Sequence, residues 1–150
     1  MSMTEKKPGR IVGIDYGEVR IGIAITDPQQ QIASPLITYV RRGARQDAQY
    51  FRRLAQDEEV QRFIVGLPLS LDGGESRKSI EARKFGKWLA EVTNLPVKFF
   101  DERYTTVQAE QLMLQADLSR KSRKRRVDKL AAQIMLQAYL ESRQKDRRQG

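Results

Sequence analysis

Residues 10–26, RIVGIDYGEVRIGIAIT, decide the fold, because they hold two runs of β-branched residues joined by a short polar segment. Residues 10–15 and 21–26 are rich in isoleucine and valine, a composition typical of β-strands. Residues 16–20 would form the five-residue loop of a β-hairpin. The chain is therefore predicted to open with two antiparallel strands, the first of which ends at Asp15.

The rest of the chain alternates between extended and helical patterns. We expect strands at 36–40, 62–66 and 97–100, and helices at 45–58, around 80–89, from 105 to about 116, and from about 127 to 142. Three leading strands followed by alternating helices and strands predict an α/β protein, with a mixed five-stranded sheet flanked by helices. Residues 1–150 would form a single domain, and the polar segments 1–8 and 143–150 would be flexible tails.

The chain contains no histidine and no cysteine, which narrows its possible chemistry. This composition excludes Ser-His and Cys-His nucleophiles, imidazole acid–base catalysis, zinc sites built on His or Cys, and disulfides. Carboxylates are the strongest catalytic groups that remain. Because hard cations prefer oxygen ligands, the residues available fit Mg²⁺ or Mn²⁺.

The charge of the chain indicates a polyanionic partner. Lysine and arginine total 28 against 19 acidic residues, which gives a net charge of +9. Six of these cations crowd into residues 120–126, the basic segment: Arg120, Lys121, Arg123, Lys124, Arg125 and Arg126. Such clustering is typical of nucleic-acid binding, although a solvated loop that aids solubility is the simpler alternative. No stretch is apolar enough to span a membrane, so we expect a cytoplasmic protein without a membrane partner.

Three acids occupy positions where carboxylates are uncommon. Asp15 ends the first strand, Glu102 follows the fifth strand, and Asp128 opens the last helix near its apolar side. Ligands of open α/β sheets bind beyond the carboxyl ends of the strands, so Asp15 and Glu102 can converge there. Each acid also has an ordinary explanation, as a turn residue, a loop residue or a helix N-terminal acid. Three such coincidences are less economical than one site, which would bind metal and act on phosphate.

Four ordered motifs resemble the YqgF family. They are Gly13-Ile14-Asp15-Tyr16-Gly17 with Arg20-Ile21-Gly22-Ile23-Ala24, Val65-Gly66-Leu67-Pro68 with Asp72-Gly73, Asp101-Glu102-Arg103 with Thr105-Thr106, and Val127-Asp128 with Ala131-Ala132. The resemblance implies the RNase H-like fold of RuvC-type resolvases. It also implies a nuclease that matures the 5′ end of pre-16S ribosomal RNA, in a family also described as Holliday-junction resolvases. Lys129 and Tyr104 depart from the residues common in that family.

The resemblance places the catalytic, metal-binding acids at Asp15, Glu102 and Asp128. Two metal ions roughly 3.5–4 Å apart could bridge the scissile phosphate, with Asp15 as the ligand that both ions share. Arg20, Arg103 and the basic segment, through Lys121, Arg123, Lys124, Arg125 and Arg126, are expected to bind the substrate backbone. Asp101 could support the metal ligands or be a solvated loop acid.

Other functions stay open on sequence alone. RNA, including ribosomal precursor particles, is favoured over branched DNA as the partner, but the residues do not separate the two. Residues 13–17 also resemble the first phosphate loop of actin-like and sugar-kinase phosphotransferases, which need two such domains. A non-catalytic RNA-binding module is a third possibility, although it would gain nothing from three clustered acids. The endo- or exonucleolytic mode, the oligomeric state and the metal used are not determined by these patterns.

Overall fold

The computed structural model describes the backbone of residues 9–105 and 120–149, and the side chains of residues 9–105 and 128–144. The elements are β1 (Arg10–Asp15), β2 (Arg20–Thr26), β3 (Ala33–Val40), α1 (Ala44–Asp57), β4 (Val60–Leu67), α2 (Arg77–Thr93), β5 (Val97–Asp101), the 3₁₀ turn η1 (Glu102–Tyr104) and α4 (Arg120–Gln149). The predicted mixed sheet and the leading hairpin are therefore confirmed.

The five strands lie in the order β3-β2-β1-β4-β5. β1 pairs antiparallel with β2, and β2 pairs antiparallel with β3. β4 pairs parallel with both β1 and β5. The carboxyl ends of β1, β4 and β5 therefore meet at one edge of the sheet, with β4 in the middle. This edge carries Asp15 and, directly after β5, Glu102.

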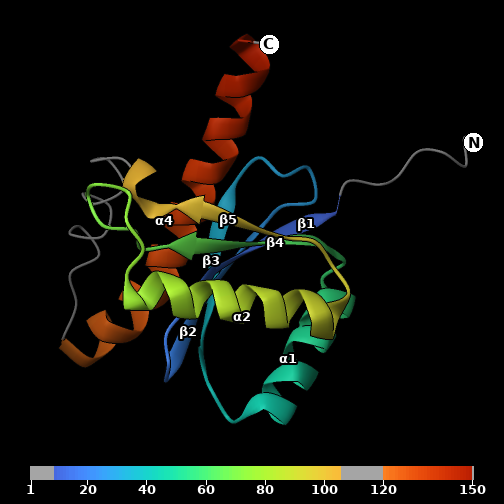
Figure 1. The fold of residues 1–150 in the computed structure, drawn as a ribbon. Helices are drawn as coiled ribbons and strands as arrows, with labels where there is room; N and C mark the ends of the chain where they lie inside the picture. Colours follow the sequence, from blue (N-terminus) through green and yellow to red (C-terminus); the bar gives the residue numbers. More distant parts are fainter. Residues whose placement is uncertain (1–8, 106–119, 150) are drawn as a thin grey trace, which may run out of the picture.

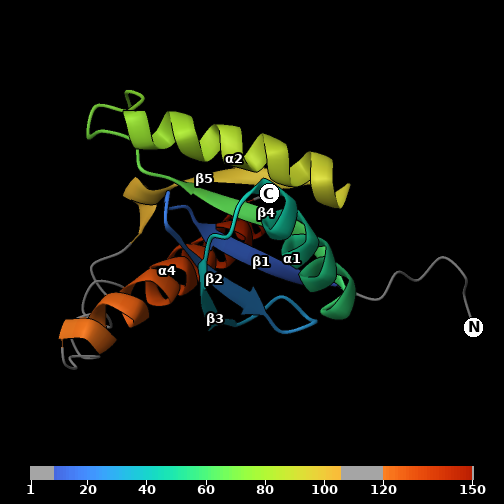
Figure 2. The same cartoon turned by 90° about the horizontal axis from the view of Figure 1, so that it is seen from below.

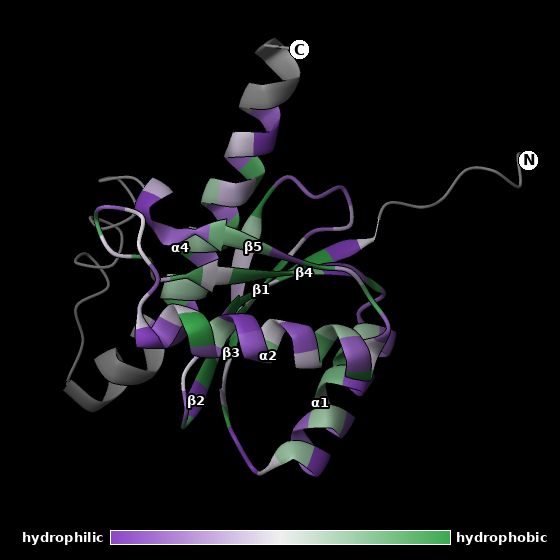
Figure 3. Cartoon of the chain, in the orientation of Figure 1, coloured by the Kyte–Doolittle hydropathy of each residue, from purple (hydrophilic) through white to green (hydrophobic). Residues whose placement is uncertain are grey.

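Helices cover both faces of the sheet (Figures 1 and 2). α1 and α2 lie on one face, where the core includes Phe51, Phe63 and Leu89. α4 crosses the other face and buries Met135 and Leu136. The central strands are mostly green in Figure 3, because the residues on both of their faces are apolar, whereas the helices alternate between green and purple. Strands buried on both sides and amphipathic helices are what this layered architecture requires.

Strand β3 begins earlier than the sequence predicts. It starts at Ala33 rather than at residue 36, and so includes Pro35. Proline has no N–H to donate, but β3 lies at the edge of the sheet and needs hydrogen bonds on one side only. The pairing with β2 also shifts register between Ile23 and Ala24, and Ala24 is the partner of Pro35. The proline therefore marks an irregularity within an edge strand instead of the start of one.

Helix α4 is longer than predicted at both ends. It begins at Arg120 and ends at Gln149, so it includes the basic segment and most of the predicted C-terminal tail. Residues 120–149 contain neither glycine nor proline, and arginine and lysine are good helix formers, so nothing local stops the helix. The predicted helix at 105–116 and the tail at 1–8 fall largely or wholly outside the described residues. None of the described helices is long and apolar enough to cross a membrane.

Candidate active site

Asp15 lies at the carboxyl end of β1 on the face that α4 covers. Side chains alternate between the two faces of a strand, so Ile11, four residues before Asp15, lies on the same face as Asp15. Ile11 belongs to the core beneath α4. Gly13 lies against the same helix, because a Cβ there would be 2.9 Å from the Cβ of Leu136. Asp15 continues this row. The carboxylate of Asp15, at the end of β1, therefore points toward the space between the sheet and α4.

Glycines flank Asp15 on both neighbouring strands. Gly22 of β2 is its direct partner, and Gly66 of β4 follows Val65, the partner of Ile14. A Cβ on Gly66 would overlap the carboxylate of Glu102, and a Cβ on Gly22 would overlap the main-chain carbonyl of Asp128. Glycine is thus required at both positions for close approach. These two glycines let the other two acids come close to Asp15.

Glu102 reaches this position from a single turn. β5 ends at Asp101, and Glu102 is the first residue of η1. Gly66 is paired with Phe100 in the adjacent strand, so the Glu102 side chain returns across β4 toward Asp15. Sequence analysis placed Glu102 just past the fifth strand, and the structure confirms that location.

Burial and mutual repulsion raise the pKa of the central acids. Burial, and after it the negative charges of Glu102 and Asp128, together raise the pKa of Asp15 to about 7. Burial also raises the pKa of Glu102, helped by the charge of Asp101. Lys78 at the start of α2 opposes both rises. A positive charge brought to this edge would therefore stabilise the ionised form of Asp15 more than that of the other acids.

The three acids do not form a closed metal-binding set. Among the described side chains, no group of three acidic residues is arranged to hold a metal ion as it stands. Asp128 instead pairs with Arg20, with 3.4 Å between its Oδ2 atom and the Nε atom of Arg20. The structure thus brings Asp15, Glu102 and Asp128 together at one edge, but Asp128 forms an ion pair with a residue of the same chain, Arg20. The donor chemistry, two carboxylates beside the partly buried carboxylate of Asp15, fits a hard divalent cation.

An open cavity of about 510 Å³ borders Asp128, one of the three acids. Its lining includes Arg20, Lys78 and Asp128, together with the β1–β2 loop. The lining holds three cations, since Arg77 also belongs to it, together with Glu18, Glu81 and Asp128. Cations at the opening of the site are what a phosphate-binding cleft requires. The sequence predicts that Arg20 contacts the substrate. It does not indicate Lys78 as a site residue, because an exposed lysine in the first turn of a helix has no distinctive sequence pattern. Gly22 and Gly66 did carry one, since an isolated glycine in a strand indicates close approach.

Arg103 is bonded to two groups of its own chain. Its guanidinium bonds the carboxylate of Asp101, with Nε at 3.0 Å from Oδ1 and 2.9 Å from Oδ2. Its Nη1 atom donates to the carbonyl oxygen of Leu71 at 3.2 Å. Arg103 also lowers the pKa of Asp101, mainly through this side-chain hydrogen bonding. The expectation that Arg103 binds the substrate backbone receives no support from these contacts, and Asp101 faces Arg103.

The basic segment forms the first turns of α4, directly before Asp128. The side chains of Lys121, Arg123, Lys124, Arg125 and Arg126 lie outside the described part of the chain. Their helical backbone does place them on the same element as Asp128. Their role in binding stays a prediction.

Known proteins resemble this chain over most of its length. The family model of RuvX, described as Holliday junction resolvase, matches residues 9–142. A protein of Rhodopirellula baltica is 50% identical over 134 residues, which cover 89% of this chain and 78% of that protein. A protein of Syntrophomonas wolfei is 43% identical over 132 residues, which cover 88% of this chain and 94% of that protein. Both are named "Putative pre-16S rRNA nuclease".

Solved structures share the fold. Thermus thermophilus RuvC, in a complex with Holliday junction substrate, has a TM-score of 0.62 at 14% identity, and the match covers 91% of this chain and 96% of that one. The fowlpox virus Holliday junction resolvase has a TM-score of 0.51 at 15% identity, with 89% and 99% covered. These likenesses confirm the RNase H-like architecture. The family match also includes residues 13–17, the loop on which the phosphotransferase alternative rested.

Proposed function

The chain belongs to the RuvX family, which is the YqgF family of the sequence resemblance, and on this premise we propose how it acts as a nuclease. Hydrolysis of a phosphodiester would take place at the carboxyl edge of β1, β4 and β5. Asp15, Glu102 and Asp128 would hold one or two Mg²⁺ or Mn²⁺ ions there. The observation that carries this proposal is Asp15, flanked by glycines and raised in pKa by burial and by the other two acids.

The chemistry of the site follows from its charge. When bound, a divalent cation would polarise the phosphate and lower the pKa of an attacking water. Asp15, with its raised pKa, would lose its proton as that positive charge arrives. Glu102 would approach over Gly66, and Asp128 would exchange Arg20 for the metal. Two carboxylates on opposite sides of Asp15 would thus complete the ligand set.

Arg20 and Lys78 would hold the substrate. Both line the cavity beside the acids, and each interacts with acids of the site when no substrate is present. A phosphodiester entering this cavity would offer its negative oxygens to these cations. Arg20 released from Asp128 would be free to donate to a non-bridging oxygen. The basic segment, on the same helix as Asp128, would contact phosphates farther along the strand.

We take ribosomal precursor RNA as the substrate and the cytoplasm as the location. Support comes from the relatives, which are named for pre-16S rRNA and reach 50% identity over 134 residues. Branched DNA is the second candidate, because the family model is described as a Holliday junction resolvase. A two-metal mechanism would serve either polymer, so the choice depends on how the surroundings of the acids accept each shape.

A side-by-side cleavage assay tests this function. Purified protein would receive 5′-extended 16S precursor RNA, an unstructured single strand and a synthetic four-way junction, each with Mg²⁺, with Mn²⁺ or with excess chelator. We expect metal-dependent cleavage of the precursor near the mature 5′ end. Preferential cutting of the junction would favour the resolvase alternative. Binding of RNA without any cleavage would instead favour a non-catalytic module.

A further inference from the structure

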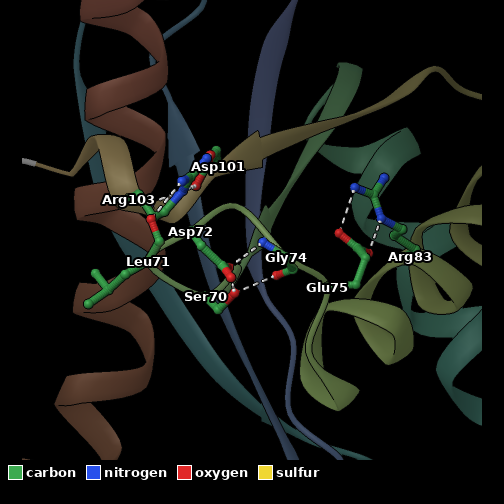
Figure 4. Close-up of polar contacts among 8 residues, drawn as sticks. All are labelled: Ser70, Leu71, Asp72, Gly74, Glu75, Arg83, Asp101 and Arg103. Atoms are coloured by element: carbon green, nitrogen blue, oxygen red, sulfur yellow. Dashed lines mark hydrogen bonds and ion pairs between the residues drawn. The ribbon is translucent and has the colours of Figure 1, made fainter.

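Arg103 contacts Asp101 and the loop that contains Leu71 (Figure 4). Its main-chain N–H and its guanidinium both bond the carboxylate of Asp101, the last residue of β5. The same guanidinium donates to the carbonyl oxygen of Leu71, in the loop between β4 and α2. Arg103 itself belongs to η1, the turn that begins with Glu102. One side chain therefore ties the end of β5, the 3₁₀ turn and the neighbouring loop together.

The loop that Arg103 reaches is itself held by hydrogen bonds. Ser70 Oγ donates to the carboxylate of Asp72 at 2.5 Å, and the N–H of Gly74 donates to the same oxygen at 2.8 Å. Ser70 N–H donates to Gly74 O at 3.0 Å, and Gly73 N–H donates to Ser70 O at 2.8 Å. A loop closed in this way presents the Leu71 carbonyl as a fixed acceptor. These bonds give the loop a defined conformation.

Glu102 depends on these bonds more than the other acids do. Asp15 is part of a central strand and Asp128 is part of a long helix, so regular hydrogen bonding fixes their backbones. Glu102 is in a 3₁₀ turn of three residues, and its carbonyl accepts bonds only from Thr105 in the described part of the chain. Such a short turn has little stability of its own. The hydrogen bonds made by Asp101, which caps the turn, and by Arg103, which clamps it to the loop, supply the stability that the turn lacks.

We infer that Arg103 is a positioning residue, which fixes Glu102 against Asp15 by clamping η1 to Asp101 and to the β4–α2 loop. This inference rests on the proposed function, since it assigns Glu102 to the metal site. It replaces the expected contact with substrate, because the guanidinium already has a carboxylate and a carbonyl as partners. Asp101 acts through Arg103, and so it also belongs to the clamp.

The test compares Arg103→Gln with Arg83→Gln. Arg83 is a matched control, because it pairs with Glu75 of the same loop, with Nε at 2.6 Å from Oε1, but has no bond to η1 (Figure 4). We expect Arg103→Gln to lower kcat about 10-fold to 100-fold and to raise the half-saturating Mg²⁺ concentration by a similar factor, the usual cost of losing a partner behind a metal ligand. KM and the salt dependence of RNA binding should not change. Arg83→Gln should stay within twofold of wild type.

Two further variants keep the test decisive. Arg103→Lys should fail to restore kcat, since an ammonium cannot bond the carboxylate through a planar fork and also reach Leu71. Asp101→Asn should show the same loss as Arg103→Gln, and the double variant should be no worse than either one. A melting temperature near that of wild type would show that each variant is folded.

The outcomes separate this inference from the proposed function. A raised KM and a flatter salt slope with unchanged kcat would make Arg103 a substrate contact and overturn the inference. Equal behaviour of Arg103→Gln and Arg83→Gln would also overturn it. If wild type cleaves nothing, the proposed nuclease function fails, but titration with Mn²⁺ by calorimetry still decides the positioning role. Weaker Mn²⁺ binding by Arg103→Gln alone would support it, and equal binding would refute it.

Discussion

Replacing Asp15 by asparagine should stabilise the metal-free protein at neutral pH. The carboxyl ionises near 3.8 in an unfolded chain, but in the folded protein burial and the charges of Glu102 and Asp128 raise its pKa to about 7. Between these values the folded state binds more protons than the unfolded state, so stability falls as the pH rises. Above pH 7 the full penalty is present. Asparagine has nearly the same shape and never ionises, so Asp15→Asn escapes this penalty.

The size of the effect follows from the two pKa values. A difference of about 3 at 1.36 kcal/mol per pH unit gives an upper bound of about 4 kcal/mol. Asp15 is half-buried rather than enclosed, and water screens part of the repulsion, so we expect about 2 kcal/mol. For a domain of this length that corresponds to an increase of roughly 4–8 °C in melting temperature.

Thermal unfolding in chelator from pH 4 to pH 8 measures this difference. The gap between Asp15→Asn and wild type should open as the pH rises and should narrow in saturating Mg²⁺, which stabilises wild type alone. Asp27→Asn is a control of opposite sign. The N–H groups of Ile32 and Gln31 lower the pKa of Asp27, so its variant should be less stable at neutral pH and should approach wild type as the pH falls. A gap for Asp15→Asn that does not change with pH would refute the electrostatic reasoning.

Four further changes test other parts of the site and its surroundings. Gly66→Ala should lower cleavage strongly with little loss of stability, because the added Cβ meets the movable carboxylate of Glu102, and comparing kcat with melting temperature checks this. Gly22→Ala should destabilise the protein by about 1–3 kcal/mol in urea unfolding, since its Cβ meets the main chain of Asp128. Lys78→Gln should tighten Mn²⁺ binding severalfold in calorimetry, because Lys78 offsets the repulsion among the acids, whereas Lys84→Gln on the same helix should not. Replacing Lys124, Arg125 and Arg126 by glutamine should flatten the slope of log affinity against log salt by about two units, and an unchanged slope would assign these charges to solubility.

Much of the fold follows from local patterns in the sequence. The β-branched runs at 10–15 and 21–26 and the amphipathic pattern of α1 predict elements that the structure confirms within a few residues. Ile80 of α2 is an exception to this agreement between pattern and burial, because this apolar side chain is 46% exposed. The buried residue in this first turn is Ser79, which forms a capping box with the N-cap residue Ser76. Capping, instead of hydrophobicity, therefore decides which side chain of this turn is buried.

The limits of sequence analysis are clearest where a residue depends on distant partners. Pro35 reads as a strand breaker, and only its place on an edge strand makes it acceptable. Arg103 reads as a free cation beside an acid, and the carbonyl of Leu71, 32 positions earlier, gives it another role. Asp15 could be placed at a strand end from the sequence, but its repulsion by Glu102 and Asp128 depends on strand order and on the path of α4.

The measurement that tests the central claim most directly is single-turnover cleavage of 5′-extended 16S precursor RNA by wild type and by Asp15→Asn, with saturating enzyme in Mg²⁺ and in chelator. The account predicts cleavage by wild type in Mg²⁺ only, and none by Asp15→Asn, although the variant binds the RNA and melts at or above the wild-type temperature in chelator. Cleavage by Asp15→Asn at the wild-type rate, or cleavage by wild type in chelator, would contradict it.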